Sequence, residues 1–179
     1  MVRSVFLFLL AILVSLFAAQ GFAQDALTIT KQGIEYGKQG KWDRAIREFN
    51  KATDLDPNYA PAYYNMGVAY EKLGKTAEAV DSYERAVESD PEYVAPHINL
   101  ATLYDKSRKY NEAVEEMEKV LEVEPENATA HYSLGYLYCR QKKYALAWKH
   151  ARKAEELNHP KAEKLLAELQ DQTRKGKTP

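Results

Sequence analysis

Cysteine, glycine and proline are all scarce in this chain. The single cysteine, Cys139, cannot form an internal disulfide or, by itself, a multi-thiolate metal site. With 8 glycines and 7 prolines among 179 residues, long flexible linkers are excluded. Neither sign of charge dominates, because 25 lysines and arginines are balanced by 26 aspartates and glutamates. This balance lacks the basic surface that nucleic-acid binding requires, so no nucleic-acid partner is expected.

Long hydrophobic runs are absent except at the N-terminus. Arg3 precedes an apolar stretch over residues 5–19, and small residues follow at Gly21 and Ala23. This order predicts a signal peptide over residues 1–23, cut after Gly21 or Ala23, and therefore an exported protein that is periplasmic or secreted. The stretch is shorter than the roughly 20 apolar residues of a membrane-spanning helix. An uncleaved segment that anchors the chain to a membrane is the alternative.

The rest of the chain repeats itself four times from Ala26 onward, with a period of 34 residues. The eighth position of each repeat holds a small residue, the eleventh holds tyrosine, the twentieth holds alanine, and proline closes three of the repeats. These columns are Gly33, Gly67, Ala101 and Gly135; Tyr36, Tyr70, Tyr104 and Tyr138; Ala45, Ala79, Ala113 and Ala147; and Pro57, Pro91 and Pro125.

Each repeat contains two amphipathic stretches, such as residues 60–73 and 76–89, with a short turn at Gly74 and Lys75 between them. Apolar residues recur in them at steps of three and four, which predicts helices and not strands. The small residues at positions eight and twenty would let the two helices of a repeat approach closely where they cross. Proline stops the second helix, because the residue before it disfavours helical geometry. The fold class predicted is all-α.

These columns resemble the tetratricopeptide repeat (TPR) family, over residues 26 to 161. The resemblance implies a right-handed superhelical solenoid of four helix-turn-helix units, over residues 26–59, 60–93, 94–127 and 128–161. In the fourth unit, Trp148 replaces a smaller residue and Ala151 replaces a larger one, which predicts a volume-conserving repacking. An apolar stripe of Ala162, Leu165, Leu166 and Leu169 predicts a capping helix over residues 160–171. A disordered basic tail is expected over residues 172–179.

No residue pattern predicts catalysis. The segment ending in Gly74, Lys75 and Thr76 has the order of a phosphate-binding loop but follows a helix and lacks the first glycine. His97 and His131 both occupy position four of the repeat, where an aromatic residue packs in the second unit, so a structural role is expected. The chain is therefore predicted to be no enzyme, with no cofactor, metal or small-molecule substrate. Asn127 begins a glycosylation sequon whose use is left open, as is the role of Cys139.

The resemblance also implies a concave groove lined by the first helix of each unit. The groove positions of the last three units carry several tyrosines, whose large faces suit binding, although an ordinary solvated face is the other interpretation. A family clamp for C-terminal carboxylates is not expected, because Thr30 and Ile34 stand at its basic positions. The predicted peptide-binding residues are Tyr64, Val68, Lys72, Ile98, Lys106, Tyr132, Tyr136 and Arg140, with Glu71, Thr102, Asp105 and Cys139 beside them and Thr30, Ile34 and Lys38 in the first unit.

The predicted function is a non-catalytic scaffold or adaptor of the cell envelope that binds a protein or peptide partner in this groove. The ligand would be an extended peptide or helix, and Lys72, Lys106 and Arg140 favour an acidic or mixed-charge one. The alternative is a structural assembly factor of an envelope complex that contacts its partners through the convex face or the capping helix.

Overall fold

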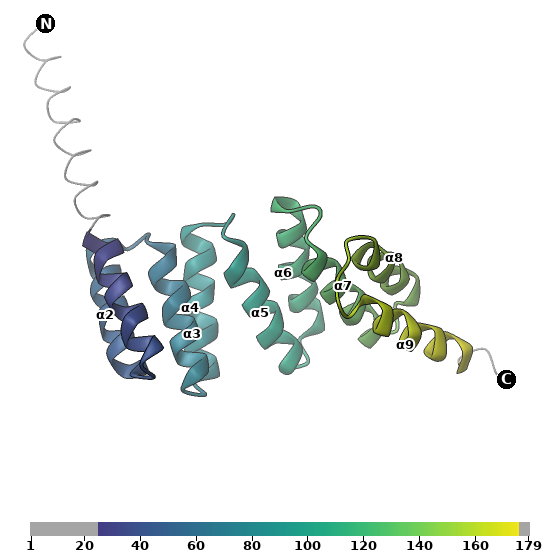
Figure 1. The fold of residues 1–179 in the computed structure, drawn as a ribbon, viewed down its shortest axis with the longest axis horizontal. Coiled ribbons are helices and arrows are strands. Elements are labelled where there is room, and N and C mark those ends of the chain that lie inside the picture. The colour runs from purple at the N-terminus through teal and green to yellow at the C-terminus, as the bar shows by residue number, and fades with distance from the viewer. Residues whose placement is uncertain (1–24, 176–179) are drawn as a thin grey trace, which may run out of the picture. The chain divides into compact units, whose positions relative to one another are not determined.

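A computed structural model describes residues 25–175, and the predicted signal peptide lies outside them. Within this range the chain is helical with no strands, so the all-α prediction is confirmed (Figure 1). The chain divides into two compact units after Pro91. The first contains a helix over residues 25–38 and then α2 (Trp42–Leu55), α3 (Ala60–Lys72) and α4 (Thr76–Ser89). The second contains α5 (Val94–Lys106), α6 (Tyr110–Val123), α7 (Ala128–Arg140), α8 (Tyr144–Glu156) and α9 (Ala162–Lys175).

The turn inside each repeat adopts one backbone conformation. Gly40 and Gly74 have φ angles of 71° and 72°, in the left-handed region that closes many helices. The predicted turn at Gly74 is therefore confirmed, with the Lys75 backbone N–H donating to the Tyr70 carbonyl at 2.9 Å. Arg108 and Lys142 stand at the same position of the later repeats with φ of 59°. A side chain in this region is strained, so the fold imposes the turn even where glycine is missing.

Small residues at position eight allow the helices of a pair to touch, as the repeat columns predict. A Cβ atom on Gly67 would lie 2.5 Å from the Tyr83 ring, which is fully buried below it. At Gly135 the nearest atom would be the backbone nitrogen of Ala151, at 3.0 Å. Close approach, and not an unusual φ, therefore favours glycine at both positions, most strongly at Gly67.

In the fourth repeat, a side chain from α9, and not Trp148 alone, fills the space beside the small Ala151. The Leu165 side chain from α9 would lie 3.1 Å from a Cβ at Gly135, in space left by the small Ala151. The Trp148 ring is only half-buried and lies under the Arg152 guanidinium at 5.3 Å. The volume lost at Ala151 is thus restored largely from another helix.

The capping helix packs by the stripe that its sequence predicts. Ala162, Leu165 and Leu169 are buried against the core of the second unit, and Leu166 is half-buried. The predicted bounds were wrong at both ends, because α9 begins at Ala162 and continues to Lys175. Residues 172–175 are therefore helical and not a disordered tail, with the Thr173 hydroxyl donating to the Leu169 carbonyl at 2.8 Å. Residues 176–179 lie outside the described range.

Candidate functional site

The predicted binding residues of the second unit follow the helical repeat along α7. Tyr132, Tyr136 and Arg140 are four residues apart, so they share one face of the helix. Tyr132 and Tyr136 are half-buried, whereas Arg140 is exposed. This face is hollowed at two places that share Tyr136.

The first cavity, the α5–α7 hollow, has a volume of about 320 Å³. Its floor is apolar and its walls carry hydroxyl and carboxylate groups, a mixture typical of ligand sites. It is lined by Ala101, Thr102 and Asp105 of α5, Met117 of α6, Tyr132, Ser133, Tyr136 and Leu137 of α7, and Lys161 before α9.

The second cavity, the α7–α9 hollow, has a volume of about 220 Å³. It is lined by Tyr136, Cys139 and Arg140 of α7 and by Glu168, Asp171 and Gln172 of α9. The capping helix thus covers the core with one face and forms a wall of the candidate site with the other.

Asp105 is the acidic group of the α5–α7 hollow. It is half-buried, and no side chain among residues 25–175 hydrogen-bonds or ion-pairs with its carboxylate. Burial raises the pKa of Asp105, against the opposing charge of Arg140. The Arg140 guanidinium is directed elsewhere, because its Nη2 donates to the Tyr110 hydroxyl at 2.8 Å and its Cζ lies 5.5 Å from the centre of that ring.

Tyr132 is fixed in the wall of the same hollow by the segment that precedes α9. Its ring stacks on His159, with centroids 4.3 Å apart and planes inclined by 18°. Burial raises the pKa of Tyr132, and the charge of Glu168 adds to this effect. Burial lowers the pKa of His159, and Lys161 acts in the same direction. The stacked pair is therefore neutral near pH 7 and presents a flat aromatic wall.

The structure places the other predicted residues differently. Ile98 packs partly against the core of the second unit, and Lys106 is exposed on α5. Tyr64, Val68 and Lys72 share one face of α3 in the first unit, where the Tyr64 ring lies 5.9 Å from that of Tyr83. These two groups of residues belong to different units.

Two features of the site escaped the sequence reasoning. The expectation that Thr30 faces a groove was wrong: it is 2% exposed, and its Oγ1 has no hydrogen-bond partner among residues 25–175. The contribution of α9 was also missed, although Glu168 and Asp171 lie on the polar side of its apolar stripe and a helical projection would have shown them. Cys139 lines the α7–α9 hollow, and burial, followed by the charge of Glu168, raises the pKa of its thiol. That environment disfavours the reactive thiolate.

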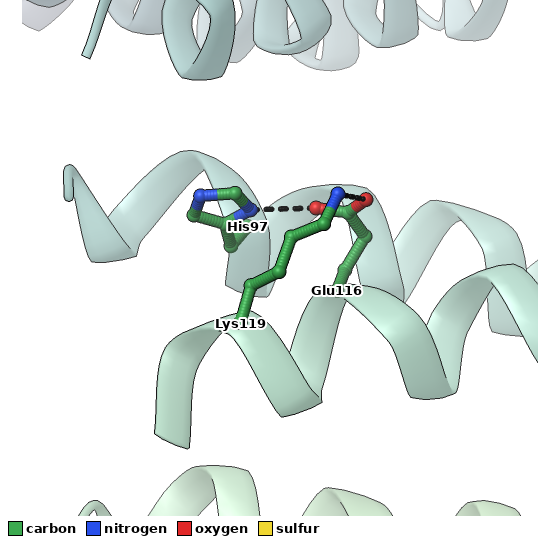
Figure 2. Close-up of polar contacts among 3 residues, drawn as sticks. All are labelled: His97, Glu116 and Lys119. Atoms are coloured by element: carbon green, nitrogen blue, oxygen red, sulfur yellow. Dashed lines mark hydrogen bonds and ion pairs between the residues drawn. The ribbon is translucent and has the colours of Figure 1, made fainter. Parts of the chain in front are cut away.

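His97 has a buried partner on the second helix of its repeat. Its Nδ1 donates to Glu116 Oε2 at 2.6 Å, and Lys119 Nζ donates to Glu116 Oε1 at 2.8 Å (Figure 2). Burial acts to raise the pKa of Glu116, but these two hydrogen bonds outweigh it and hold that pKa below its usual range. The carboxylate is therefore ionised, and the cluster joins α5 to α6. This is a structural role, as expected for His97.

His131 has the equivalent partner one repeat later. Its Nε2 lies 3.1 Å from the Pro125 carbonyl and must donate to it, so a neutral His131 accepts at Nδ1 from His150 Nδ1, also at 3.1 Å. Burial, then the charges of His131 and Lys149, lower the pKa of His150 to about 4, against the opposing effect of Glu118. Protonation of His150 is therefore disfavoured in the folded protein.

Asn127, the sequon residue, caps α7. Its Oδ1 accepts from the Ala130 backbone N–H at 2.9 Å, and its Nδ2 donates to Glu124 at 2.6 Å. The amide is thus engaged on both sides.

No group of three or more metal-ligating side chains that could hold a metal occurs within residues 25–175. Over the same part of the chain, no helix combines the length and hydrophobicity that membrane spanning requires.

Comparison with known proteins agrees with the repeat columns. One family model, described as TPR repeat, matches residues 33–74, and two described as tetratricopeptide repeat match residues 60–93 and 98–172. The chain belongs to the tetratricopeptide repeat family. A search of curated proteins finds no match.

Solved TPR structures resemble the chain over most of its length. A MamA crystal structure is 29% identical with a TM-score of 0.69, and the match covers 77% of this chain and 81% of that one. PilF of Pseudomonas aeruginosa, at 23% identity and a TM-score of 0.73 over 87% and 72% of the two chains, shows the same fold. The first TPR of Spaghetti (RPAP3), solved with the HSP90 peptide SRMEEVD, is 32% identical with a TM-score of 0.62 over 67% and 98%.

The similarity to these solved TPR structures confirms the predicted solenoid fold class. Members of the family generally act as non-catalytic modules that bind proteins or peptides. The predicted role as a protein–protein interaction scaffold is therefore supported at that level.

Proposed function

We propose that this TPR protein is an exported, non-catalytic adaptor of the cell envelope that holds an extended peptide segment of its partner against α5 and α7. The observation that carries the proposal is the α5–α7 hollow, a cavity of about 320 Å³ with two tyrosine walls on the predicted binding face. Export rests on the signal-like residues 1–23.

The polar groups of the hollow support a peptide ligand. The Tyr136 and Ser133 hydroxyls and the Asp105 carboxylate form no hydrogen bond with another side chain among residues 25–175. A peptide backbone offers N–H and C=O groups that such hydroxyls and carboxylates can bind, while the tyrosine rings supply contact area at low entropic cost. The peptide-bound RPAP3 structure supports this mode of use, although that peptide is acidic and this hollow contains Asp105.

To test this proposal, peptides that bind the protein are selected from a displayed library of random twelve-residue sequences. The affinity of the selected peptides is then measured by calorimetry. Tyr136→Glu removes the tyrosine ring from both hollows, and we expect it to weaken binding at least tenfold. Leu146→Glu is the matched control, because Leu146 is a 41% exposed apolar residue on α8 outside both hollows. Circular dichroism must show that both variants keep the helical content of the wild type.

Peptides that bind the Tyr136→Glu variant as tightly as the wild type would overturn the proposed site. In that case the alternative role, assembly of an envelope complex through the convex face or α9, is the one to pursue. The α7–α9 hollow favours keeping that alternative, because Glu168, Asp171 and Gln172 of α9 line it.

A further inference from the structure

We propose that the α5–α7 hollow binds a cationic side chain, arginine or lysine, of the peptide ligand, with Asp105 as the counter-ion and Tyr136 as the aromatic platform. This inference rests on the proposed function and adds the chemistry of the residue that anchors the peptide. Of the acidic or mixed-charge ligands that Lys72, Lys106 and Arg140 suggested, it favours a mixed-charge one.

Asp105 is the first group in the hollow that favours a cationic ligand. A carboxylate that loses water without gaining a donor is destabilised, and a ligand that brings a donor relieves this penalty. The Asp105 side chain lines the hollow, is half-buried and receives no hydrogen bond from any side chain within residues 25–175. Arg140, whose charge acts to lower the pKa of Asp105, forms no ion pair with it and donates to the Tyr110 hydroxyl.

The ring of Tyr136 is the second group that favours a cationic ligand. Aromatic faces attract cations, and this protein uses that contact repeatedly: a lysine or arginine lies over the ring of Tyr36, Tyr63, Tyr70, Tyr104, Tyr110, Tyr138 and Trp148. Tyr136 lines both hollows, yet no lysine or arginine of residues 25–175 lies over its ring. A ligand guanidinium or ammonium in the hollow would supply the missing cation.

The charges around Tyr136 are the third feature that favours a cationic ligand. Asp105 lies in one hollow, and Glu168 and Asp171 lie in the other, so carboxylates occur on both sides of the ring. The cations that line the two hollows are Lys161 and Arg140. The two hollows are thus lined by three carboxylates and two cations, and the ammonium of Lys161 can donate to the carbonyl groups of the peptide backbone.

The experiment uses peptides selected on the wild-type protein from the random library. We expect arginine or lysine to be enriched at one position of these peptides. Asp105→Asn, which keeps the size of the side chain and removes its charge, should then weaken binding at least tenfold. Asp43→Asn, an exposed carboxylate on α2, is the matched control and should leave the affinity unchanged. Replacing the enriched residue by citrulline, a neutral analogue of arginine, should reduce the affinity for the wild-type protein to that measured with the Asp105→Asn variant. The same replacement should not weaken binding to the Asp105→Asn variant any further.

Two different failures are distinguishable. If the selected peptides depend on Tyr136 but show no basic position, or if Asp105→Asn binds them like the Asp43→Asn control, the cationic anchor is wrong and the peptide site stands. If the selected peptides bind equally well to Tyr136→Glu, the peptide site itself is wrong, and this inference falls with it.

Discussion

Gly67→Ala should destabilise the protein although alanine is the better helix former. The new Cβ would lie 2.5 Å from Cε1 and 2.6 Å from Cδ1 of the Tyr83 ring, closer than carbon atoms can approach. The ring cannot easily move away, because it is fully buried and its hydroxyl donates to Glu71 at 2.7 Å. Overpacking costs about 1–3 kcal/mol, and contacts this short with a buried ring belong in the upper part of that range. Because helix propensity returns roughly 1 kcal/mol, we expect a net loss of about 1–2 kcal/mol.

The third repeat supplies a compensating change for this variant. Position eight there is Ala101, and the residue in the place of Tyr83 is the flexible Met117. Adding Tyr83→Met to Gly67→Ala therefore recreates a pair that the protein already packs. Urea unfolding followed by circular dichroism at 222 nm would measure both single variants and the double variant.

The double variant should be more stable than the sum of the single effects predicts, by about 1 kcal/mol or more. A Gly67→Ala variant as stable as the wild type would refute the close-approach argument. Strict additivity of the two substitutions would refute it as well, because it would show that the side chains at positions 67 and 83 do not meet.

The remaining predictions concern one turn, one cap and one histidine pair. Arg108→Gly should stabilise the protein by about 0.5–1 kcal/mol in urea unfolding, because glycine adopts the φ of 59° at this position without strain. Gly74→Ala should destabilise the protein by about 1 kcal/mol, because it introduces that strain. Asn127→Ala should lower the unfolding free energy by about 1 kcal/mol and Asn127→Ser should largely retain it, since the serine keeps a capping oxygen without placing a second carboxylate beside Glu124. Stability should fall as pH falls from about 6.5 to about 4, because the unfolded chain protonates His150 first; after allowing for partial exposure, the loss is about 1–2 kcal/mol. His150→Gln should flatten that slope in urea titrations at several pH values, and an unchanged slope would show that the pair does not titrate as described.

The fold follows from columns that recur in all four repeats. Gly67 and Ala79 mark where two helices cross, and Pro91 marks where the second helix stops, so the repeat columns alone are enough to place the helices. The same register also predicts a left-handed conformation at Arg108, which stands in the column of Gly40 and Gly74.

The candidate site was harder to predict because its residues come from elements without a common column. Tyr132 and Tyr136 follow from the repeat, but Glu168 belongs to α9, which has no counterpart in the other repeats. The partners of the histidines were equally hidden. Glu116 follows His97 by 19 residues on another helix, and only the crossing of the two helices brings them together.

The most direct test of the central claim is photo-crosslinking from a single position in the α5–α7 hollow. A photoreactive amino acid at Thr102, an exposed residue that lines the hollow, would be irradiated with a library-selected peptide, and the adduct located by mass spectrometry. The account predicts an adduct from position 102 that disappears in the Tyr136→Glu variant, and none from position 146 on α8. Crosslinking from position 146 in place of position 102 would contradict it.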